Sequence, residues 1–381
     1  MEWKEDVLGN VLEVKYGKDH KKLADGQYPV YGSGGLMRYV DSKLYDGPSI
    51  LIPRKGTLNN IMFVESPFWT VDTMFWSIIN TDKVDPKFLF YSICKRDFAS
   101  MNVGSAVPSM TVNILNDIQI SYPKNIEDQR RIASILSSLD RKIELNNKIN
   151  ADLEEMAQAI FKNWFVDFDP FKDGKFVDSE LGMIPEGWKV GRLDEIADVV
   201  GGSTPSKAKP EYYTQKGIAW LTPKDLSNHP AVYTSRGEID ITEEGYNSTS
   251  TKLMPKGTVL FTSRAPIGYI SIAQNDICTN QGFKSLVPKK AGTCFLYCFL
   301  KYVTPEIENK STGSTFKEAS GSLMKSLQVI MPEQKVFEDF ETIVSPLFAR
   351  IESLEKENSR LSTLRDTLLP RLMSGELEVP E

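Results

Sequence analysis

Residues with the chemistry for catalysis are few and scattered in this chain of 381 residues. Its two histidines, His20 and His229, lie far apart, and no spacing typical of a metal site surrounds either of them. No G-x-S-x-G, G-x-x-x-x-G-K-[ST] or Asn/Asp-Pro-Pro-Tyr/Phe motif occurs. Residues 201–207 contain the glycines of a phosphate loop but not its Gly-Lys-Ser/Thr ending, and Pro205 removes a backbone donor. We therefore expect that the chain is not an enzyme and that it binds neither a metal ion nor a cofactor.

Polar and basic side chains on the predicted loops favour recognition of nucleic acid instead. Arg, Lys, Asn, Gln, Ser and Thr match the donors and acceptors of base edges and the phosphate oxygens of DNA. Any one such residue is equally explained by solvent exposure, so the prediction depends on the whole set. The candidate DNA-binding residues of the first half are Lys18, Tyr31, Ser33, Arg38, Arg54, Lys55, Asn59, Asn60, Ser105 and Ser109. Those of the second half are Ser203, Thr204, Ser206, Lys207, Lys224, Ser263, Arg264, Asn280, Gln281, Ser314, Thr315 and Lys317.

The chain contains a long internal repeat. Residues 104–123, GSAVPSMTVNILNDIQISYP, align without a gap with residues 313–332, GSTFKEASGSLMKSLQVIMP, at an offset of 209 residues. Upstream, a similar match places Arg54 and Arg264 at equivalent positions, so these two candidates carry the most weight. Coincidence between two β-rich domains would also produce some likeness. Matched Gly, Gln and Pro residues over about twenty positions favour duplication of a whole unit.

Each half has the same predicted order of elements, with strands and short helices first and one long helix last. Short apolar runs bounded by Gly, Asn and Asp predict strands. Short helices are expected at residues 86–95 and 294–303. The predicted strands include residues 49–53, 61–64 and 74–79, and residues 259–262, 269–272 and 284–287. This order indicates an α+β protein with an internal pseudo-two-fold duplication.

Two long amphipathic helices are predicted, at residues 126–165 and 333–373. Their apolar residues recur at spacings of three and four, which indicates a coiled-coil seam. Neither helix would be stable alone in water, and the duplication makes the other helix its most economical partner, in antiparallel orientation. The candidate coiled-coil interface residues are Ile132, Leu136, Leu139, Ile143, Leu153, Ile160, Val344, Leu347, Ile351, Leu354, Leu361 and Leu368.

Each apolar stripe has one gap, which holds Asn146 in the first helix and Asn358 in the second. A buried Asn at a seam position can fix the register and the choice of partner. An Asn that is merely tolerated or exposed explains the same pattern, so both interpretations stay open.

The elements predict two globular domains, residues 1–124 and 181–332, separated by two helical regions, residues 125–180 and 333–381. A helix of 40 residues is ~60 Å long, so the pair would form a rod between the domains. In chain order the four segments carry net charges of 0, −4, +3 and −5. The excess acid of this chain, with its net charge of −6, therefore lies in the helical regions and does not exclude DNA binding by the domains. It does argue against strong non-specific affinity for DNA.

The sequence also favours a cytoplasmic protein. The N-terminal residues lack the basic and apolar segments of a signal peptide, and no apolar run approaches the ~18 residues of a membrane span. None of the four cysteines forms a C-x-x-C pair, which fits a reducing compartment.

Several segments resemble one family of DNA-reading proteins. Residues 184–189, IPEGWK, followed by residues 201–206, GGSTPS, resemble the opening of a target-recognition domain in type I restriction-modification specificity (S) subunits. Residues 218–226, IAWLTPKDL, resemble the next block of such a domain. Residues 31–35, YGSGG, and residues 54–56, RKG, resemble the corresponding blocks of a second variety.

Residues 160–170 and 368–377 are similar to the ends of the two conserved helices of that family, so the resemblance covers nearly the whole chain. It implies that each domain reads one half of a bipartite, asymmetric site in double-stranded DNA, and that the helices set the unread spacer. It also implies partners: two methyltransferase (modification) subunits that carry S-adenosylmethionine, and motor-nuclease (restriction) subunits that use ATP and Mg. An adenine in each half-site would be methylated after it is flipped from the stack.

Two other functions remain open at this stage. The chain could serve a related system whose partner is a single fused nuclease-methyltransferase chain, which the identity of the co-purifying subunit would decide. It could also be a coiled-coil scaffold that binds only proteins. In that case deletion of either globular domain would leave the DNA affinity of the assembled complex unchanged.

Overall fold

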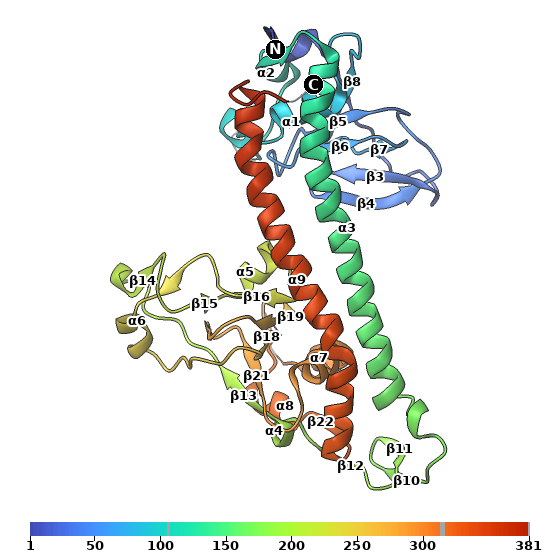
Figure 1. Ribbon diagram of the computed structural model, residues 1–381, viewed down its shortest axis with the longest axis vertical. Coiled ribbons are helices and arrows are strands. Elements are labelled where there is room, and N and C mark those ends of the chain that lie inside the picture. The colour runs from blue at the N-terminus through green and yellow to red at the C-terminus, as the bar shows by residue number, and fades with distance from the viewer. Residues whose placement is uncertain (105–106, 313–316, 380–381) are drawn as a thin grey trace. The chain divides into compact units, whose positions relative to one another are not determined.

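The computed structural model describes residues 1–104, 107–312 and 317–379. They form two compact units, the first made of Met1–Glu144 with Ser359–Glu381 and the second of Leu145–Asn358. The helices α3 (Ile126–Phe165) and α9 (Gln334–Met373) each have 40 residues and are divided between the two units (Figure 1). The prediction of two long helices is therefore confirmed within one residue at every end.

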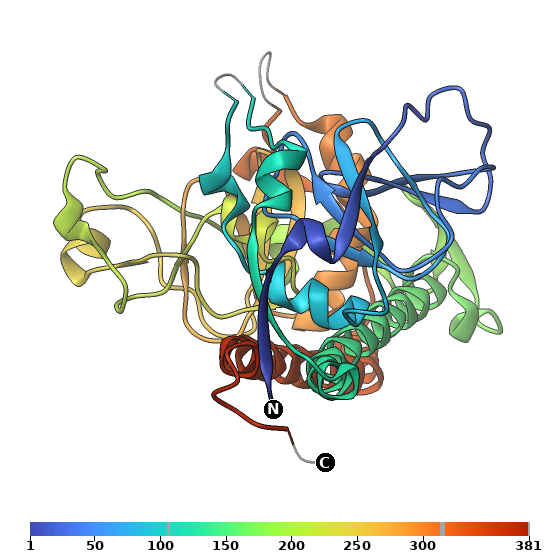
Figure 2. The ribbon, with the colours of Figure 1, turned by 90° about the horizontal axis from the view of Figure 1, so that it is seen from above.

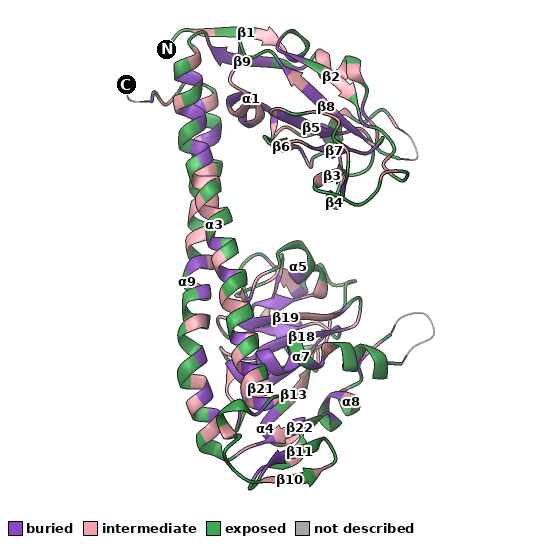
Figure 3. Ribbon diagram, turned by 90° about the vertical axis from the view of Figure 1, so that its right-hand side faces the viewer, coloured by how far each residue is buried: buried purple, intermediate pink, exposed green. Residues whose placement is uncertain are grey.

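The first unit contains two small sheets beside its parts of α3 and α9. One sheet has the strand order β2-β8-β5-β6, the other has the order β4-β3-β7, and β1 pairs with β9. The β3–β4 hairpin lies on the side of this unit away from α3 and α9 (Figures 2 and 3). The elements are β1 (Trp3–Val7), η1 (Leu8–Asn10), β2 (Leu12–Tyr16), β3 (Tyr28–Gly32), β4 (Gly35–Val40), β5 (Ser49–Pro53), β6 (Met62–Val64), β7 (Trp69–Thr70), β8 (Met74–Ile79), α1 (Pro86–Ile93), η2 (Phe98–Met101), α2 (Val112–Asn116) and β9 (Gln119–Pro123).

The second unit has a larger sheet with the strand order β13-β21-β18-β19-β16, and four two-stranded pairs surround it. Its helix α7 packs on strands β18 and β19 of this sheet. The elements are η3 (Asp169–Phe171), β10 (Phe176–Ser179), β11 (Gly182–Pro185), β12 (Lys189–Arg192), α4 (Leu193–Ile196), β13 (Ala197–Gly201), η4 (Pro210–Tyr212), β14 (Tyr213–Thr214), β15 (Trp220–Leu221), α5 (Pro223–Asn228), β16 (Tyr233–Thr234), β17 (Asp240–Ile241), α6 (Glu243–Asn247), β18 (Val259–Ser263), β19 (Ile267–Ala273), β20 (Cys278–Thr279), β21 (Lys284–Pro288), α7 (Thr293–Lys310), α8 (Gly321–Ser326) and β22 (Gln328–Met331).

The two units repeat one another in strand register. In the first unit Leu12 pairs with Ile79, and in the second Ala197 pairs with Pro288, which are shifts of 185 and 209 residues. The same two shifts relate the β1–β9 pair to the β12–β22 pair. The caps of the following helices also match, because Thr111 caps α2 and Ser320 caps α8, again 209 residues apart. The internal duplication is thus a property of the fold and not only of the sequence.

In the first unit the long helices pack against the globular core as well as against each other. Ile132 and Leu136 of α3 are fully buried in one cluster with Leu369 and Leu372 of α9 and with residues of the sheet. Arg365 of α9 donates to Asp140 of α3 at 2.7 Å. Of the other predicted interface residues in this unit, Leu139, Ile143, Leu361 and Leu368 are partly buried.

In the second unit the aromatic residues of the helices form the centre of the core. Phe161 and Phe165 of α3 contact Phe340 of α9, with ring centroids 6.2 and 5.1 Å apart. Both α3 and α9 therefore supply side chains to the domain core and to each other, and their surfaces alternate between buried and exposed strips (Figure 3). Of the predicted interface residues here, Val344, Ile351 and Leu354 are buried, and Leu153, Ile160 and Leu347 are partly buried.

A layer of polar residues interrupts the apolar contacts of α3 and α9 in the second unit. Asn146 is fully buried and donates to Asn358 at 2.9 Å and to Glu357 at 3.0 Å. Asn358 donates in turn to Asn147 at 2.7 Å. The structure favours the interpretation in which these asparagines fix the register and the partner, because each makes a specific contact across the helices.

No helix in the described part of the chain has both the length and the apolar character that crossing a membrane requires.

Candidate nucleic-acid interface

Five of the candidate residues of the first unit come together around the end of β5. Asn60 donates its side-chain amide to the carbonyl of Ser33 at 2.8 Å. Lys55 and Ser109 face each other in an antiparallel bridge, and the carbonyl of Arg54 accepts from the N–H of Met110 at 2.9 Å. Three loops that are distant in the sequence therefore form one polar surface.

Basic side chains on and near this surface are accessible to solvent. The Arg54 guanidinium lies 5.6 Å from the centre of the Tyr16 ring, a cation–π contact that leaves its N–H groups available to phosphate or base edges. Lys55 is exposed, and within the described residues it forms no ion pair. Lys18 is also exposed, and its backbone ties the loop after β2 to Thr70 at 2.8 Å. These three candidates are basic groups of the first unit that are at least partly accessible to solvent.

Three other candidates of the first unit have contacts within the protein. Arg38 donates to the carbonyl of Leu23 at 3.0 Å and pairs with Asp25 at 2.8 Å, which holds the loop before β3. Asn59 donates to Asp97 at 3.1 Å, toward η2. Tyr31 is half-buried against the apolar cluster that contains Val30 and Val71, and burial raises the pKa of its hydroxyl. These contacts give the three residues structural roles that the sequence alone does not reveal.

In the second unit the loop after β13 packs on the loop after β20. The N–H of Ser203 donates to the carbonyl of Thr279 at 3.0 Å, and the side chains of Thr204 and Gln281 are hydrogen-bonded. Gly202 permits this approach, because a Cβ at its position would lie 2.2 Å from the carbonyl oxygens of Thr279 and Asn280. The predicted residues of two separate segments thus form one surface here as well.

The remaining candidates of the second unit differ in accessibility. Ser263 is fully buried and its hydroxyl donates to the carbonyl of Gly282 at 3.2 Å, so it does not lie on the surface. Lys224 is exposed near Glu238, and Lys317 donates to the carbonyl of Glu308 at 3.2 Å. Ser206, Lys207 and Asn280 are at least partly exposed. Ser105, Ser314 and Thr315 lie outside the described residues.

The predicted equivalence of Arg54 and Arg264 is wrong by one residue. Arg54 N–H donates to the carbonyl of Thr73, and the matching bond of the second unit runs from Ser263 to Gly282. The second bond of the pair, from Met110 to Arg54, likewise recurs from Ala319 to Ser263. All three positions are shifted by the same 209 residues as the repeat. Arg54 therefore corresponds to Ser263, and the counterpart of Arg264 is Lys55.

The structure adds two charged residues that the sequence analysis missed. Glu318 lies 3.4 Å from both the Arg264 guanidinium and the Lys284 ammonium. Lys284 begins β21, where the apolar strand pattern hides it. Glu318 directly follows the candidates Ser314, Thr315 and Lys317, but an acidic residue was not expected to contact DNA. The repeat could have found Glu318, because its counterpart in the first unit is the candidate Ser109.

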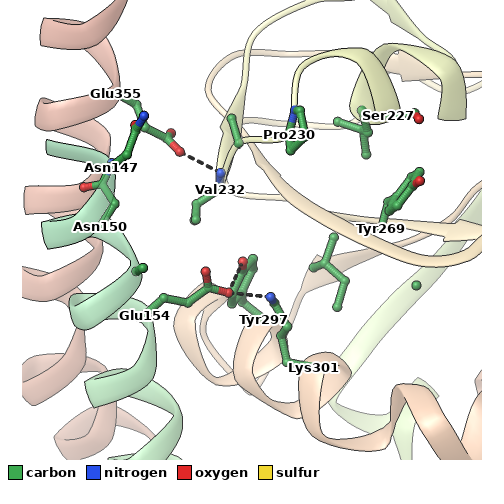
Figure 4. A pocket seen from close by; sticks show the side chains of 15 residues that line it. Asn147, Asn150, Glu154, Ser227, Pro230, Val232, Tyr269, Tyr297, Lys301 and Glu355 are labelled. Carbon is green, nitrogen blue, oxygen red and sulfur yellow. Dashed lines mark hydrogen bonds and ion pairs between the residues drawn. The ribbon is translucent and has the colours of Figure 1, made fainter. Parts of the chain in front are cut away.

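A cavity of about 430 Å³ lies between the long helices and the domain within the second unit (Figure 4). Glu355 of α9 reaches across it and accepts from the N–H groups of Val232 at 2.7 Å and Tyr233 at 3.0 Å. Glu154 of α3 accepts from the Tyr297 hydroxyl at 2.8 Å and pairs with Lys301 at 2.6 Å. The helices are thus tied to the domain by polar contacts in addition to the apolar core.

Burial changes the titration of the first of these carboxylates. Desolvation raises the pKa of Glu355 from its ordinary value of 4.5 to about 7, although the two backbone N–H donors oppose the shift.

The first unit has a contact related to that of Glu154 with Tyr297, in which Tyr91 of α1 donates to Asp140 of α3 at 2.6 Å. Each unit therefore carries a tyrosine–carboxylate bond between a domain helix and α3.

Comparisons with known proteins agree with these observations. A family model for the type I restriction modification DNA specificity domain matches residues 1–155 and 185–362. The chain is 40% identical over 193 residues to the type I restriction enzyme MjaIX specificity subunit of Methanocaldococcus jannaschii. That match covers 50% of this chain and 44% of the relative, so the chain spans less than half the length of that protein.

Two further comparisons cover most of the chain. The type I restriction enzyme HindI specificity subunit of Haemophilus influenzae is 26% identical over 386 residues, with 83% of each protein covered. A crystal structure of the type I restriction-modification system S subunit from M. genitalium matches with a TM-score of 0.62 and 19% identity. It covers 97% of this chain and 96% of that one, and at this identity the likeness shows the fold alone.

Proposed function

Because this chain belongs to the family of type I restriction modification DNA specificity domains, we propose that it selects the DNA sequence on which a type I complex acts. Like its relatives, which are named specificity subunits, the chain is a recognition subunit and not an enzyme. In this proposal each unit reads one half of a two-part site in double-stranded DNA.

The two polar surfaces are the observation that carries the proposal. Each includes the end of the same strand of a duplicated domain, β5 in the first unit and β18 in the second. In the second unit the N–H of Ser263, at the end of β18, donates to the carbonyl of Gly282 in the loop that holds Gln281. The residues that line them differ, with Lys55 and Ser109 in one unit against Arg264 and Glu318 in the other. Different side chains on equivalent loops support recognition of two different half-sites, because base edges are distinguished by their pattern of donors and acceptors.

The long helices supply the second part of the proposal. As an antiparallel coiled-coil pair, α3 and α9 would set the spacing of the two readers and so the length of the unread DNA between the half-sites. Methyltransferase subunits would dock on the helices and domains and bring S-adenosylmethionine, and restriction subunits would bring ATP-driven motor and nuclease activity. The methyl group would be transferred to an adenine flipped from the duplex.

Modification mapping of host DNA tests this function. A methylated-adenine motif in two parts, separated by an unread spacer, is expected in the host genome and should disappear when the gene for this chain is deleted. Restoring the gene should restore the motif. Persistence of every such motif in the deletion strain would contradict the proposal.

A further inference from the structure

The polar surface of the second unit contains an acid between two cations. Glu318 places one carboxylate oxygen 3.4 Å from Arg264 and the other 3.4 Å from Lys284. The side chain of Lys284 is only 17% exposed, whereas those of Arg264 and Glu318 are 36% and 38% exposed. A cation as little exposed as Lys284 requires a counter-ion, and the more exposed carboxylate of Glu318 provides it.

These two ion pairs are of the kind that another anion can displace. Both distances are long for charge-assisted hydrogen bonds, and Glu318 is accessible, so its pairing is partly screened by water. A DNA phosphate has the same charge as the carboxylate and carries oxygens that can face both cations. The carboxylate therefore occupies a place that suits a phosphate group of bound DNA.

The duplicated fold shows how this site differs from its counterpart. By the 209-residue shift, Ser109 of the first unit occupies the position of Glu318 and Lys55 that of Arg264. Ser109 and Lys55 lie beside each other in a bridge, and no acid is introduced there. The same backbone thus carries an exposed cation in the first unit and a neutralised one in the second.

The geometry points to Glu318 as an internal competitor of DNA, whose carboxylate neutralises Arg264 and Lys284 until a backbone phosphate of the target replaces it. This inference depends on the proposed function, because it assumes that the second unit binds DNA. Breaking the two ion pairs is a cost that every DNA sequence meets. Only a duplex that makes the remaining base contacts offsets it fully, so Glu318 reduces binding to non-target DNA.

The test compares single substitutions in the complex of the full chain with its methyltransferase subunits. Glu318→Gln removes the charge and keeps the size of the side chain, and Glu318→Asp keeps the charge. Glu306→Gln is the matched control, because Glu306 lies on α7 of the same unit, pairs with Lys310 at 2.6 Å and is also exposed. Affinity is measured for a duplex that contains the mapped target and for one that lacks it, over a range of salt concentrations.

Glu318→Gln is expected to raise the affinity for the duplex without the target by about tenfold at low salt. For the same duplex, the slope of log affinity against log salt should also become steeper by about one unit. This is the change expected when one more phosphate contact releases its counterion. Glu318→Asp and Glu306→Gln should behave as the unmodified complex does. Methyl transfer at the target should be retained in all three variants.

Three results would overturn the inference. Glu318→Gln could leave the affinity and the salt slope the same as Glu306→Gln does, or it could weaken binding to the target duplex, which would make Glu318 a reading residue. Glu318→Asp could raise affinity as much as Glu318→Gln, so that the charge is not the cause. A complex that binds and methylates no two-part target in its unmodified form would instead reject the proposed function itself.

Discussion

At the scale of residues, the surface that the proposal assigns to DNA combines a small number of cations with many neutral polar groups. Lys55 is exposed at the end of β5, and Arg264 occupies the equivalent place after β18. An arginine or lysine that contacts phosphate contributes affinity that is nearly independent of sequence, whereas hydrogen bonds to base edges contribute specificity. We therefore expect this pair to position the DNA and the neighbouring Ser, Thr, Asn and Gln side chains to read it.

Replacing Lys55 or Arg264 with Ala in the assembled complex should lower its affinity for the target duplex by about tenfold, since one phosphate contact is lost in each case. The slope of log affinity against log salt should become shallower by about one unit. Lys335→Ala is the control, because it removes the same charge from an exposed position of α9, where Lys335 pairs with Asp339 and no candidate DNA-binding residue lies. If all three variants had the same salt slope as the unmodified complex, neither residue would contact phosphate.

The sequence identified polar loop segments, but it matched individual positions of the two units wrongly at Arg54 and Arg264. The likeness of two stretches of the sequence matched Arg54 with Arg264, whereas the backbone hydrogen bonds keep the 209-residue shift and match Arg54 with Ser263. The register of β18 against β19 is irregular between Phe261 and Ser263, next to this point, so a shift of one residue is easily hidden. Lys284 was missed because the pattern that predicts a strand does not show where the charged side chain at its first residue lies.

At the scale of elements, the long helices were the most predictable part of the fold. Apolar residues repeated at spacings of three and four over forty positions, and the observed bounds of α3 and α9 agree within one residue. The strands β5 and β8 were also found with their bounds. The β3–β4 hairpin was not predicted, because its Gly-rich turn and exposed apolar residues lack a regular alternation.

What the apolar spacing did not reveal is that both helices also belong to the cores of the domains. Ile132 and Leu136 pack with the sheet of the first unit, and Phe161 packs with α7 of the second. A seam read from one helix specifies which face is buried but not which element covers it. The polar contacts between helices and domains, such as that of Glu355, have no sequence pattern at all.

The contact of Glu355 with the loop before β16 predicts a pH effect on stability. The pKa of Glu355 is raised from 4.5 to about 7, so the folded chain binds this proton more tightly than the unfolded chain does. The contribution of this bound proton to the free energy of unfolding is complete below about pH 4.5 and is lost as the pH rises through about 7. Relative to a Glu355→Gln variant, the unmodified chain should therefore lose stability between these two pH values.

Denaturant unfolding of both proteins at several pH values from 4.5 to 8 checks this expectation. Glu338→Gln, at an exposed position of the same helix, is the control and should follow the unmodified chain. A difference in unfolding free energy between the unmodified chain and Glu355→Gln that is constant over this range would contradict the assigned role of burial.

At the scale of the whole molecule, the duplication supports the proposal that one chain reads an asymmetric site. Equivalent strands pair with the same shifts of 185 and 209 residues, which preserves the scaffold of both units. The loops at the ends of these strands have diverged, as Ser109 and Glu318 illustrate. A preserved scaffold with diverged loops allows one half-site to change without the other.

Exchange of one domain tests this account most directly. Residues 181–332 would be replaced by the corresponding segment of a relative with a different target, and methylated adenines would be mapped in the host genome. We predict that one half of the two-part motif changes to that of the donor protein while the other half is retained. A motif in which both halves change, or in which neither does, would contradict the claim that each unit reads its own half-site.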